Sequence, residues 1–424
     1  MKLGIIADDY TGGTDSASFL VKEGLTCIQL SGVQQQDVPL ETDVIVVSLK
    51  SRTEPADKAM KSSLEVYHWL KSQGCDVIQF KYCSTFDSTE QGNIGPVSDA
   101  ILAANGFTST IIVPSLPVNG RKVFYGNLFV KGEPLNESGM KDHPLTPMRD
   151  ANLCRLMRMQ TEGQVSLIDF ETVEQGPTLL REAFHQLEKL GNRYIIIDAF
   201  TEAHLEVIGT AFVDYPFVTG ASGLTHGLAK AISKSIDRKD QAAALVPSAN
   251  KTVILSGSCS TQTNRQVDFY KDKTNTHYVD IDKLNDIESY SLEIAQWLES
   301  LSADDYAPLI CATVNKHRLS EIRELYDFDV SACIEALFTN LVKNLKKLGY
   351  CNYICAGGET SGAVTQGLGV KELLIGKLIC PGVPWVSTLD RNIFLALKSG
   401  NFGDDDFFFR AQSLIENRGI LNEK

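Results

Sequence analysis

Two carboxylates directly follow the first apolar run of the chain. Asp8 and Asp9 come after Leu3 to Ala7, and the next residues, Thr11 to Ala17, predict a glycine turn and then a helix. An acidic residue in this place can cap the helix, whose dipole favours a negative charge there. A cap needs only one carboxylate, so the adjacent pair also predicts a site for chemistry on a ligand.

A second group of polar residues follows another apolar run. Lys81, Ser84 and Asp87 come after Val77 to Phe80, among further hydroxyl side chains. A lysine, hydroxyls and a carboxylate together would suit a polyhydroxylated ligand, and the structural alternative is a solvated turn rich in serine and threonine. The residues Gly92 to Pro96 predict the start of another helix.

The segment from Pro114 to Met148 is unlike a helix or a strand, apart from a predicted hairpin about Val130 to Gly132. A loop this long inside a compact domain is usually functional or disordered, and the aromatic and aliphatic residues here favour order. Arg121 is the natural bidentate partner for a substrate carboxylate, and Lys81 or His143 could assist it. For His143 the alternative is a structural histidine.

Two glycine-rich polar turns occur in the second half of the chain. Val253 to Leu255 is followed by Ser256 to Thr263, and Tyr353 to Ala356 is followed by Gly357 to Val364. A strand, such a turn and a helix together point backbone N–H groups at an anion, as a phosphate site requires. Neither turn is a P-loop or a GxGxxG fingerprint, and the alternative is tight turns with ordinary caps. Two turns in one domain favour a nucleotide phosphate site. Further turns, Pro381 to Trp385 and Lys398 to Gly403, support it.

Other catalytic templates do not fit the sequence. No HExxH, no GxSxG elbow and no setting for a catalytic thiol occurs, and the seven histidines never pair at short spacing. Metal chemistry is therefore confined to a hard cation such as Mg²⁺. The 10 cysteines lie among apolar neighbours, which predicts reduced core thiols.

Short apolar runs alternate with segments of helical periodicity along the whole chain. The runs are Leu3 to Ala7, Val44 to Ser48, Val77 to Phe80, Thr110 to Val113, Tyr194 to Ile197, Val253 to Leu255, Leu309 to Thr313 and Tyr353 to Ala356. This alternation predicts an α/β protein with largely parallel sheets, in which ligands collect beyond the carboxyl ends of the strands.

The length and one lapse in the pattern predict the domain organisation. At 424 residues the chain is long enough for two or three domains of roughly 150 residues each. The pattern lapses between Ile236 and Lys251, so we expect an N-terminal domain over 1–245 and a C-terminal domain over 251–424. A last helix, Phe407 to Asn417, is expected to dock on the second domain.

Charge and hydropathy limit the partners. The net charge of −13 repels nucleic acid and anionic membranes, so we expect neither as a partner. The first apolar run is too short for a signal peptide, and no run approaches the roughly 20 apolar residues that span a bilayer. We therefore expect a cytoplasmic protein. The sequence is compatible with a homo-oligomer.

Several long motifs, in this order, resemble the four-carbon acid sugar kinase family over nearly the whole chain. They are Ala7 to Gly12, Phe86 to Thr89 with Gly92-Asn93, Ala356 to Gly362, Pro381 to Pro384 and Lys398 to Gly403. Within the family, Lys81 to Thr89 and Asn136 to Met148 are similar to the branch that phosphorylates 3-oxo-tetronates at O4. The resemblance implies an N-terminal sugar-binding domain, a C-terminal nucleotide-binding domain and an active site in the interdomain cleft.

The resemblance also implies roles for individual residues. The Asp8-Asp9 pair and Arg121 face the sugar acid. ATP with Mg²⁺ is surrounded by Ser258, Gly357, Gly358, Glu359, Thr360, Ser361, Gly362 and Gly403. Lys398 either meets the transferring phosphate or is a surface lysine. Phosphoryl transfer still needs a carboxylate to orient or deprotonate the hydroxyl, and Asp8, Asp9 and Asp87 are the candidates.

The predicted function is thus an ATP-dependent phosphotransferase with an alcohol group as acceptor. We expect it to convert 3-oxo-tetronate to 3-oxo-tetronate 4-phosphate in the catabolism of acid sugars. The alternatives are a D-threonate or D-erythronate kinase of the same family, a sugar-acid lyase or isomerase, and a non-catalytic sensor of sugar acids and nucleotides.

Overall fold

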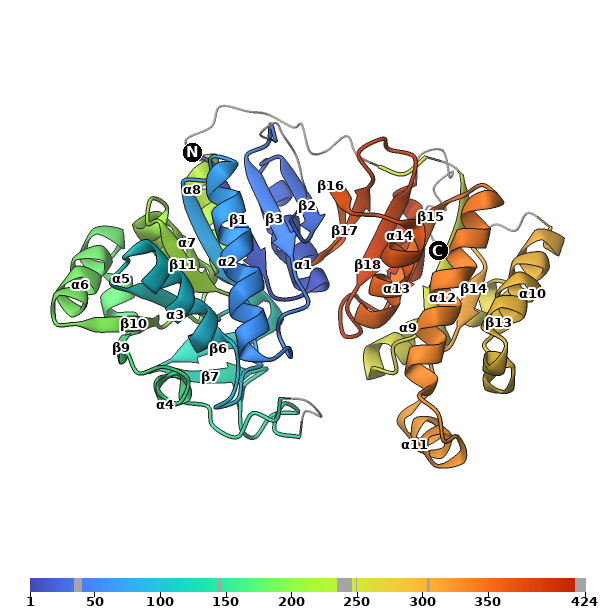
Figure 1. Cartoon of the computed structure of the whole chain (residues 1–424), viewed down its shortest axis with the longest axis horizontal. Coiled ribbons are helices and arrows are strands. Elements are labelled where there is room, and N and C mark those ends of the chain that lie inside the picture. Colours follow the sequence, from blue (N-terminus) through green and yellow to red (C-terminus); the bar gives the residue numbers. More distant parts are fainter. Residues whose placement is uncertain (34–39, 143–145, 235–245, 249, 303–305, 416–424) are drawn as a thin grey trace. The chain divides into compact units, whose positions relative to one another are not determined.

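The chain divides into two compact units, Met1–Gln241 and Ala242–Lys424. The computed structural model in Figure 1 describes residues 1–33, 40–142, 146–234, 246–248, 250–302 and 306–415. The predicted boundary between 245 and 251 falls partly outside the described residues, so it stays a prediction.

The first unit is built on a parallel sheet. Its strands are β1 (Leu3–Ala7), β2 (Cys27–Ser31), β3 (Val44–Ser48), β4 (Val77–Lys81), β5 (Thr110–Val113), β9 (Gln164–Ile168), β10 (Asn192–Ile197) and β11 (Phe217–Gly220). They lie in the order β2-β3-β1-β4-β11-β5-β10-β9, and every described pair is parallel. The central strands are buried along their whole length, as expected of a parallel sheet with both faces covered.

Helices cover both faces of this sheet (Figure 1). They are α1 (Tyr10–Lys22), α2 (Ala56–Ser72), α3 (Ile94–Asn105), α4 (Leu153–Arg158), α5 (Phe170–Glu174), α6 (Pro177–Lys189), α7 (Glu202–Phe212) and α8 (Ser222–Ser233). The core under α2 and α3 contains Ile45 and Val47 of β3. Helix α1 lies against Val46 and Ser48 of the same strand. Because side chains alternate along a strand, α1 covers the opposite face from α2 and α3.

A small antiparallel sheet extends from the first unit. It consists of β6 (Arg121–Phe124), β7 (Asn127–Val130) and β8 (Glu133–Pro134). Lys131 and Gly132 turn the chain between β7 and β8 with positive φ angles. This confirms the predicted hairpin about Val130 to Gly132. The 3-10 helix η1 (Pro117–Asn119) directly precedes β6.

The second unit has a mixed sheet. Its strands are β12 (Lys251–Ser256), β13 (Thr276–Tyr278), β14 (Leu309–Cys311), β15 (Tyr350–Ala356), β16 (Glu372–Cys380), β17 (Val383–Ser387) and β18 (Phe394–Lys398). The order is β13-β14-β12-β15-β18-β17-β16, with parallel pairing up to β18 and antiparallel pairing of β17 with both of its neighbours. The predicted turn Pro381 to Trp385 therefore contains the hairpin turn between β16 and β17 and the start of β17.

The main helices of the second unit are α9 (Thr261–Tyr270), α10 (Ile287–Ser300), α11 (Lys316–Leu325), α12 (Val330–Lys347), α13 (Gly358–Leu368) and α14 (Phe407–Ser413). Helix α14 packs Phe407 and Phe408 into the same core as Trp385. This is the docking predicted for the last helix, although the helix ends at Ser413, and residues from 416 on lie outside the described part of the chain.

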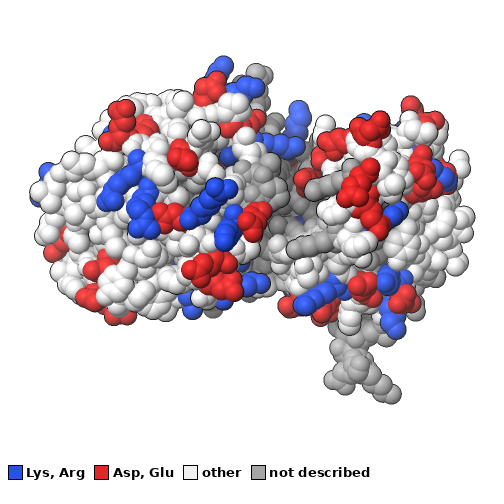
Figure 2. Space-filling view, turned by 90° about the horizontal axis from the view of Figure 1, so that it is seen from below, with Lys and Arg blue, Asp and Glu red and all other residues white. Residues whose placement is uncertain are grey.

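The structure confirms the α/β fold class and places a strand at each of the eight predicted apolar runs. The run from Leu309 to Thr313 forms a shorter strand than predicted, because β14 ends at Cys311. All ten cysteines are free. On the face drawn in Figure 2, basic and acidic side chains are intermixed. In the described part of the chain no helix is both long and apolar enough to cross a membrane.

Candidate functional site

The predicted residues of the first unit meet at the carboxyl ends of its central strands. Ala7, the last residue of β1, pairs with Lys81, the last residue of β4, so Asp8 and Asp9 emerge beside Lys81. Ala7 also pairs with Ser48, the last residue of β3, and the segment after β3 brings Arg52 to the same edge. The strand order thus gathers these side chains at one end of the sheet, as in other open α/β sheets.

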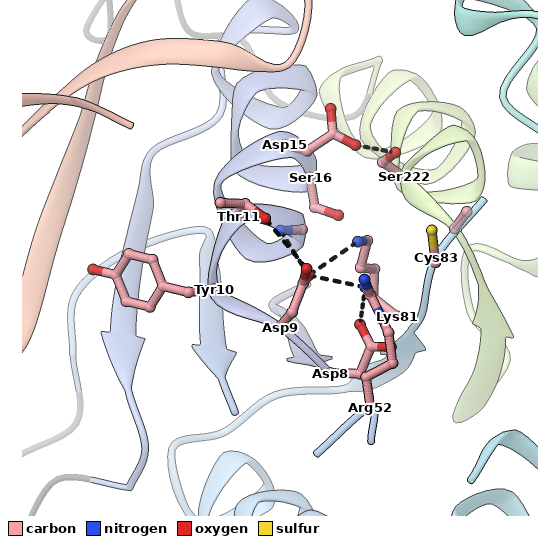
Figure 3. Close-up of polar contacts among 12 residues, drawn as sticks. Asp8, Asp9, Tyr10, Thr11, Asp15, Ser16, Arg52, Lys81, Cys83 and Ser222 are labelled. Atoms are coloured by element: carbon pink, nitrogen blue, oxygen red, sulfur yellow. Dashed lines mark hydrogen bonds and ion pairs between the residues drawn. The ribbon is translucent and has the colours of Figure 1, made fainter. Parts of the chain in front are cut away.

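Arg52 holds all three carboxylates that the sequence nominates for catalysis. Its Nε lies 2.8 Å from Asp8 Oδ2 and its Nη2 lies 2.8 Å from Asp8 Oδ1, which is a bidentate pair. The same Nη2 is 3.1 Å from Asp9 Oδ1, and Nη1 is 3.9 Å from Asp87 Oδ2. Figure 3 shows the guanidinium between Asp8 and Asp9. Sequence reasoning missed Arg52. The one available signal was a cation shortly after the apolar run Val44 to Ser48.

The two adjacent carboxylates differ in their surroundings. Asp8 is 4% exposed, and burial raises its pKa above the ordinary value although Arg52 opposes this. Burial also acts on Asp9, but there Arg52 and Lys81, together with hydrogen bonds from the Gly12 amide (2.8 Å) and the Thr11 hydroxyl (3.2 Å), outweigh it and lower the pKa. Asp9 is the N-cap of α1, which confirms the structural alternative for this residue. The cap and the contact with Arg52 use the same carboxylate.

The loop after β4 supplies the remaining polar groups. Thr85 Oγ1 donates a hydrogen bond of 2.6 Å to Asp87 Oδ1, and Cys83 Sγ lies 2.9 Å from the same hydroxyl. Ser84 is half-buried in this loop. The predicted solvated turn is therefore mostly packed, with Thr85 and Ser88 buried.

Lys81 is a buried cation with unused hydrogen-bond donors. It is 3% exposed, and its Nζ lies 4.0 Å from Asp9 Oδ1 (Figure 3). Among the described residues, no oxygen accepts a hydrogen bond from this ammonium group. A buried charge normally makes close polar contacts, because removing it from water is costly. The free N–H groups of Lys81 therefore mark a place where a ligand oxygen would bind.

Arg121 lies at the start of β6. Its backbone exchanges hydrogen bonds of 2.9 and 3.0 Å with Leu116, and its Nη1 donates to the carbonyl of Asn119. Its Nε is buried and has no partner among the described residues. His143, the other residue expected to assist, lies outside the described residues.

One of the two glycine-rich turns of the second unit leaves its helix uncapped. Helix α13 begins at Gly358, and its N-cap residue, Gly357, gives no side-chain hydrogen bond to the first turn. Gly357 has a φ of 132°, a conformation that favours glycine. In contrast, Ser260 caps α9 by accepting a hydrogen bond of 3.1 Å from the Thr263 amide. The first amides of α13, in Gly358, Glu359 and Thr360, are therefore the ones available to an anion.

The turns after β12, β15 and β18 touch one another. A Cβ on Gly257 would lie 2.6 Å from Thr360 Oγ1, and a Cβ on Gly400 would lie 2.4 Å from Ser258 Oγ. The Gly403 carbonyl accepts a hydrogen bond of 3.1 Å from Gln266 of α9. The structure thus brings together the turns that contain the predicted ATP residues Ser258, Gly357 to Gly362 and Gly403.

Lys398 is fully buried, so the prediction of a surface lysine is wrong. Its Nζ donates to Thr263 Oγ1 at 3.0 Å and to the carbonyls of Ser399 and Gly400, both at 3.1 Å. Burial lowers the pKa of Lys398 to about 7. These contacts make Lys398 a positioning residue for the turn after β18, and its predicted contact with ATP stays a prediction.

A cavity of about 480 Å³ adjoins the open end of α13. Gly257 and Cys259 line it on the side of the first turn, and Glu359 and Thr360 line it at α13. Its apolar wall comes from Ile281, Leu319, Ile322, Ile334 and Phe338, with Tyr278, Tyr326 and Phe328 nearby. An apolar pocket that ends at a helix N-terminus can hold a flat base and a phosphate chain together. Sequence reasoning missed this wall, because its residues form no motif.

Metal ligands are sparse in the described part of the chain. No group of three or more His, Cys, Asp and Glu side chains there could hold a metal ion. Mg²⁺ in phosphoryl-transfer sites is nevertheless usually held by one or two carboxylates together with substrate phosphates and waters. Glu359 is an exposed carboxylate at the open end of α13 and fits this more modest requirement.

Comparisons with known proteins cover both units. Residues 3–228 match the family model described as a sugar-binding N-terminal domain, and residues 253–408 match the one described as a nucleotide-binding C-terminal domain. A 3-oxo-tetronate kinase from Haemophilus influenzae is 46% identical over 97% of this chain and 100% of its own length. A 3-oxo-tetronate kinase from Brucella melitensis is 45% identical over 99% of this chain and 97% of its own length. A crystal structure of a Salmonella typhimurium LT2 protein matches with a TM-score of 0.91 at 46% identity, covering 98% of this chain and 100% of that one.

Proposed function

Because the chain belongs to the four-carbon acid sugar kinase family, we propose that it uses ATP to phosphorylate 3-oxo-tetronate at O4. The product is 3-oxo-tetronate 4-phosphate. No residue has to become covalently attached to the substrate, because phosphoryl transfer depends on positioning and charge stabilisation.

The observation that carries the proposal is the open N-terminus of α13 at the end of a cavity with one apolar wall. The free amides of Gly358, Glu359 and Thr360 would bind phosphate oxygens, and the apolar wall would hold the adenine. Lys398 keeps the neighbouring turn in place through its three hydrogen bonds. The unit that matches the nucleotide-binding model thus has the features that a nucleotide needs.

When Mg²⁺ is bound, its positive charge neutralises part of the negative charge of the triphosphate. Glu359 is the carboxylate that would hold it, because a negative side chain among phosphate-binding amides repels phosphate unless a cation lies between them.

The first unit would hold the sugar acid. Lys81 and Arg121 present unused donors, which suit a carboxylate. Of the three candidate carboxylates, the side chain of Asp9 is 30% exposed, whereas the side chains of Asp8 and Asp87 are 6% and 9% exposed. We therefore assign to Asp9 the orientation of the 4-hydroxyl, and to Asp8 and Asp87 the positioning of Arg52. The lowered pKa of Asp9 keeps it ionised as a hydrogen-bond acceptor at neutral pH.

The test is incubation of the purified protein with ATP and 3-oxo-tetronate, followed by mass spectrometry of the product. Parallel reactions contain D-threonate or D-erythronate. We expect a gain of one phosphoryl group on 3-oxo-tetronate, with the highest kcat/KM of the three acids. A higher kcat/KM for D-threonate or D-erythronate would reject 3-oxo-tetronate as the preferred substrate but would still agree with kinase activity. Nucleotide binding without turnover of any acid would favour a sensor instead.

A further inference from the structure

We propose that Asp15, together with Ser115 and Arg121, binds the hydroxyl group on carbon 2 of the acid sugar, next to the substrate carboxylate. These three residues are called the Asp15 cluster below. The inference rests on the proposed function, because it assigns a further specificity-determining contact to the same substrate site.

Each member of the cluster has a buried polar atom that lacks a partner among the described residues. The atoms are Asp15 Oδ1, Ser115 Oγ and Arg121 Nε. Asp15 is 5% exposed and Ser115 is 0% exposed. Buried polar groups are almost always hydrogen-bonded in native proteins, since an unpaired one destabilises the fold. Three unpaired atoms in one region therefore indicate that a ligand completes their hydrogen bonds.

A chain of direct contacts joins the three residues. Ser222, the first residue of α8, donates a hydrogen bond to Asp15 Oδ2 and leaves Oδ1 free (Figure 3). The next residue, Gly223, packs so closely on the Ser115 carbonyl that a Cβ there would lie 2.1 Å from the oxygen. Ser115 in turn precedes Leu116, whose backbone pairs with Arg121. The three residues are therefore neighbours in the fold, near the ends of β5 and β11.

Two cations act on the Asp15 carboxylate. Burial raises the pKa of Asp15, while the charges of Lys81 and Arg121 act in the opposite direction, which places both cations within electrostatic range of this carboxylate. A 2-hydroxy acid has its carboxylate and its hydroxyl on adjacent carbons. Cationic donors next to a carboxylate acceptor are complementary to that pair of groups.

The other carboxylates of the site are less suited to this contact. Both oxygens of Asp8 are engaged by Arg52, and Asp9 caps α1 with one oxygen and accepts the Thr11 hydroxyl with the other. Asp15 Oδ1 has no such partner. Hence a hydroxyl bound to Asp15 Oδ1 would not share that oxygen with a donor of the described residues, as it would on Asp8 or Asp9.

The test compares two probe acids that differ only in the hydroxyl on carbon 2, namely 2,4-dihydroxybutanoate and 4-hydroxybutanoate. Dissociation constants are measured by calorimetry on the full-length wild type and on Asp15→Ala, Asp15→Asn and Ser115→Ala. Asp99→Asn is the matched control, because Asp99 is a structural partner of Arg193 and Tyr194 in the same unit and touches none of the cluster residues.

We expect the wild type and Asp99→Asn to bind the dihydroxy acid about 10- to 100-fold more tightly, as is typical of a hydrogen bond to a charged group. Asp15→Ala should bind both acids equally. Asp15→Asn and Ser115→Ala should each retain a reduced preference, and these two milder variants decide the matter if Asp15→Ala does not fold.

The inference is overturned if Asp15→Ala, or the two milder variants in its place, keep the full preference of the wild type. It is also overturned if the wild type shows no preference. Turnover of 3-oxo-tetronate by the wild type is measured in the same series. Absence of turnover with a preference that depends on Asp15 would reject the proposed kinase reaction but not the hydroxyl contact.

Discussion

Lys81 and Lys398 occupy equivalent places in the two units but have different surroundings. Each is the last residue of a strand, β4 and β18, and each is buried, with exposures of 3% and 0%. Lys398 donates to three oxygens of its own unit. For Lys81, the described part of the chain shows one ion pair, with the Asp9 carboxylate at 4.0 Å, and no hydrogen bond from the ammonium group.

Under the proposed function, this difference separates a lysine that stabilises the protein, Lys398, from one that would bind a ligand, Lys81. Lys398 stabilises a turn whose backbone forms part of the candidate nucleotide site. Lys81 keeps its donors unused, because Arg52 already neutralises the nearby carboxylates. On this proposal the first unit would bind its substrate through charged side chains, whereas the second unit would bind phosphate through backbone amides.

The largest effect is expected from Arg52→Gln. Removing this cation leaves the negative charges of the buried Asp8 and the partly buried Asp9 without their main positive partner. The free energy of unfolding should therefore fall by about 3–5 kcal/mol. Urea unfolding at neutral pH measures this. Arg155→Gln is the control, because Arg155 makes a similar bidentate pair with Asp150 but is 62% exposed, and should cost at most about 1 kcal/mol. Equal losses in the two variants would contradict the assigned role of Arg52.

Lys81→Met should affect activity and not stability. We expect kcat/KM for the acid sugar to fall by about 10²- to 10³-fold, as when one partner of a buried charged contact is truncated. The melting temperature should change little, because the Lys81 ammonium group donates no hydrogen bond to a described residue and its ion pair with Asp9 is 4.0 Å long. Steady-state kinetics and thermal unfolding test this, with the exposed Lys122→Met as the control. A lower melting temperature with unchanged kinetics would make Lys81 a structural lysine like Lys398.

Lys398→Met should show the opposite pattern. The free energy of unfolding should fall by about 1–3 kcal/mol, because the oxygens of Thr263, Ser399 and Gly400 lose a donor. The dissociation constant for ATP should rise as the turn loosens, while the affinity for the acid sugar stays unchanged. Calorimetry with each ligand separates the two effects, and the exposed Lys371→Met serves as the control. Weaker acid binding alone would reject the positioning role.

The smallest effect is a pH dependence of stability that comes from Lys398. Its folded pKa of about 7 lies below the unfolded value of about 10.4, so between these values the unfolded chain binds more protons than the folded one. Stability therefore rises with pH across this window and is lost as pH falls toward 7. The wild type should gain stability relative to Lys398→Met between pH 7 and pH 9 in urea unfolding. A difference that is constant with pH would show that burial does not shift this lysine.

Residues next to one another in sequence could be interpreted without the structure. The apolar runs predicted strands, the Asp8-Asp9 pair predicted a helix start, and the glycines at 357 and 358 predicted a turn before a helix, because each of these depends on local periodicity and backbone freedom. The resemblance of several motifs gave the family. These are the properties that neighbouring residues determine among themselves.

Long-range packing decided the rest. Arg52 joins the site because β3 lies beside β1. Asp15 stands out only in the folded chain, where Ser222 at the start of α8 bonds one of its oxygens and the other has no described partner. The cavity wall combines residues from α11, α12 and the segment after β13. Lys81 and Lys398 are alike in sequence, at the end of an apolar run. Only the folded chain determines whether oxygens of the protein surround the buried amine, as they do at Lys398, or leave its N–H groups without acceptors, as at Lys81.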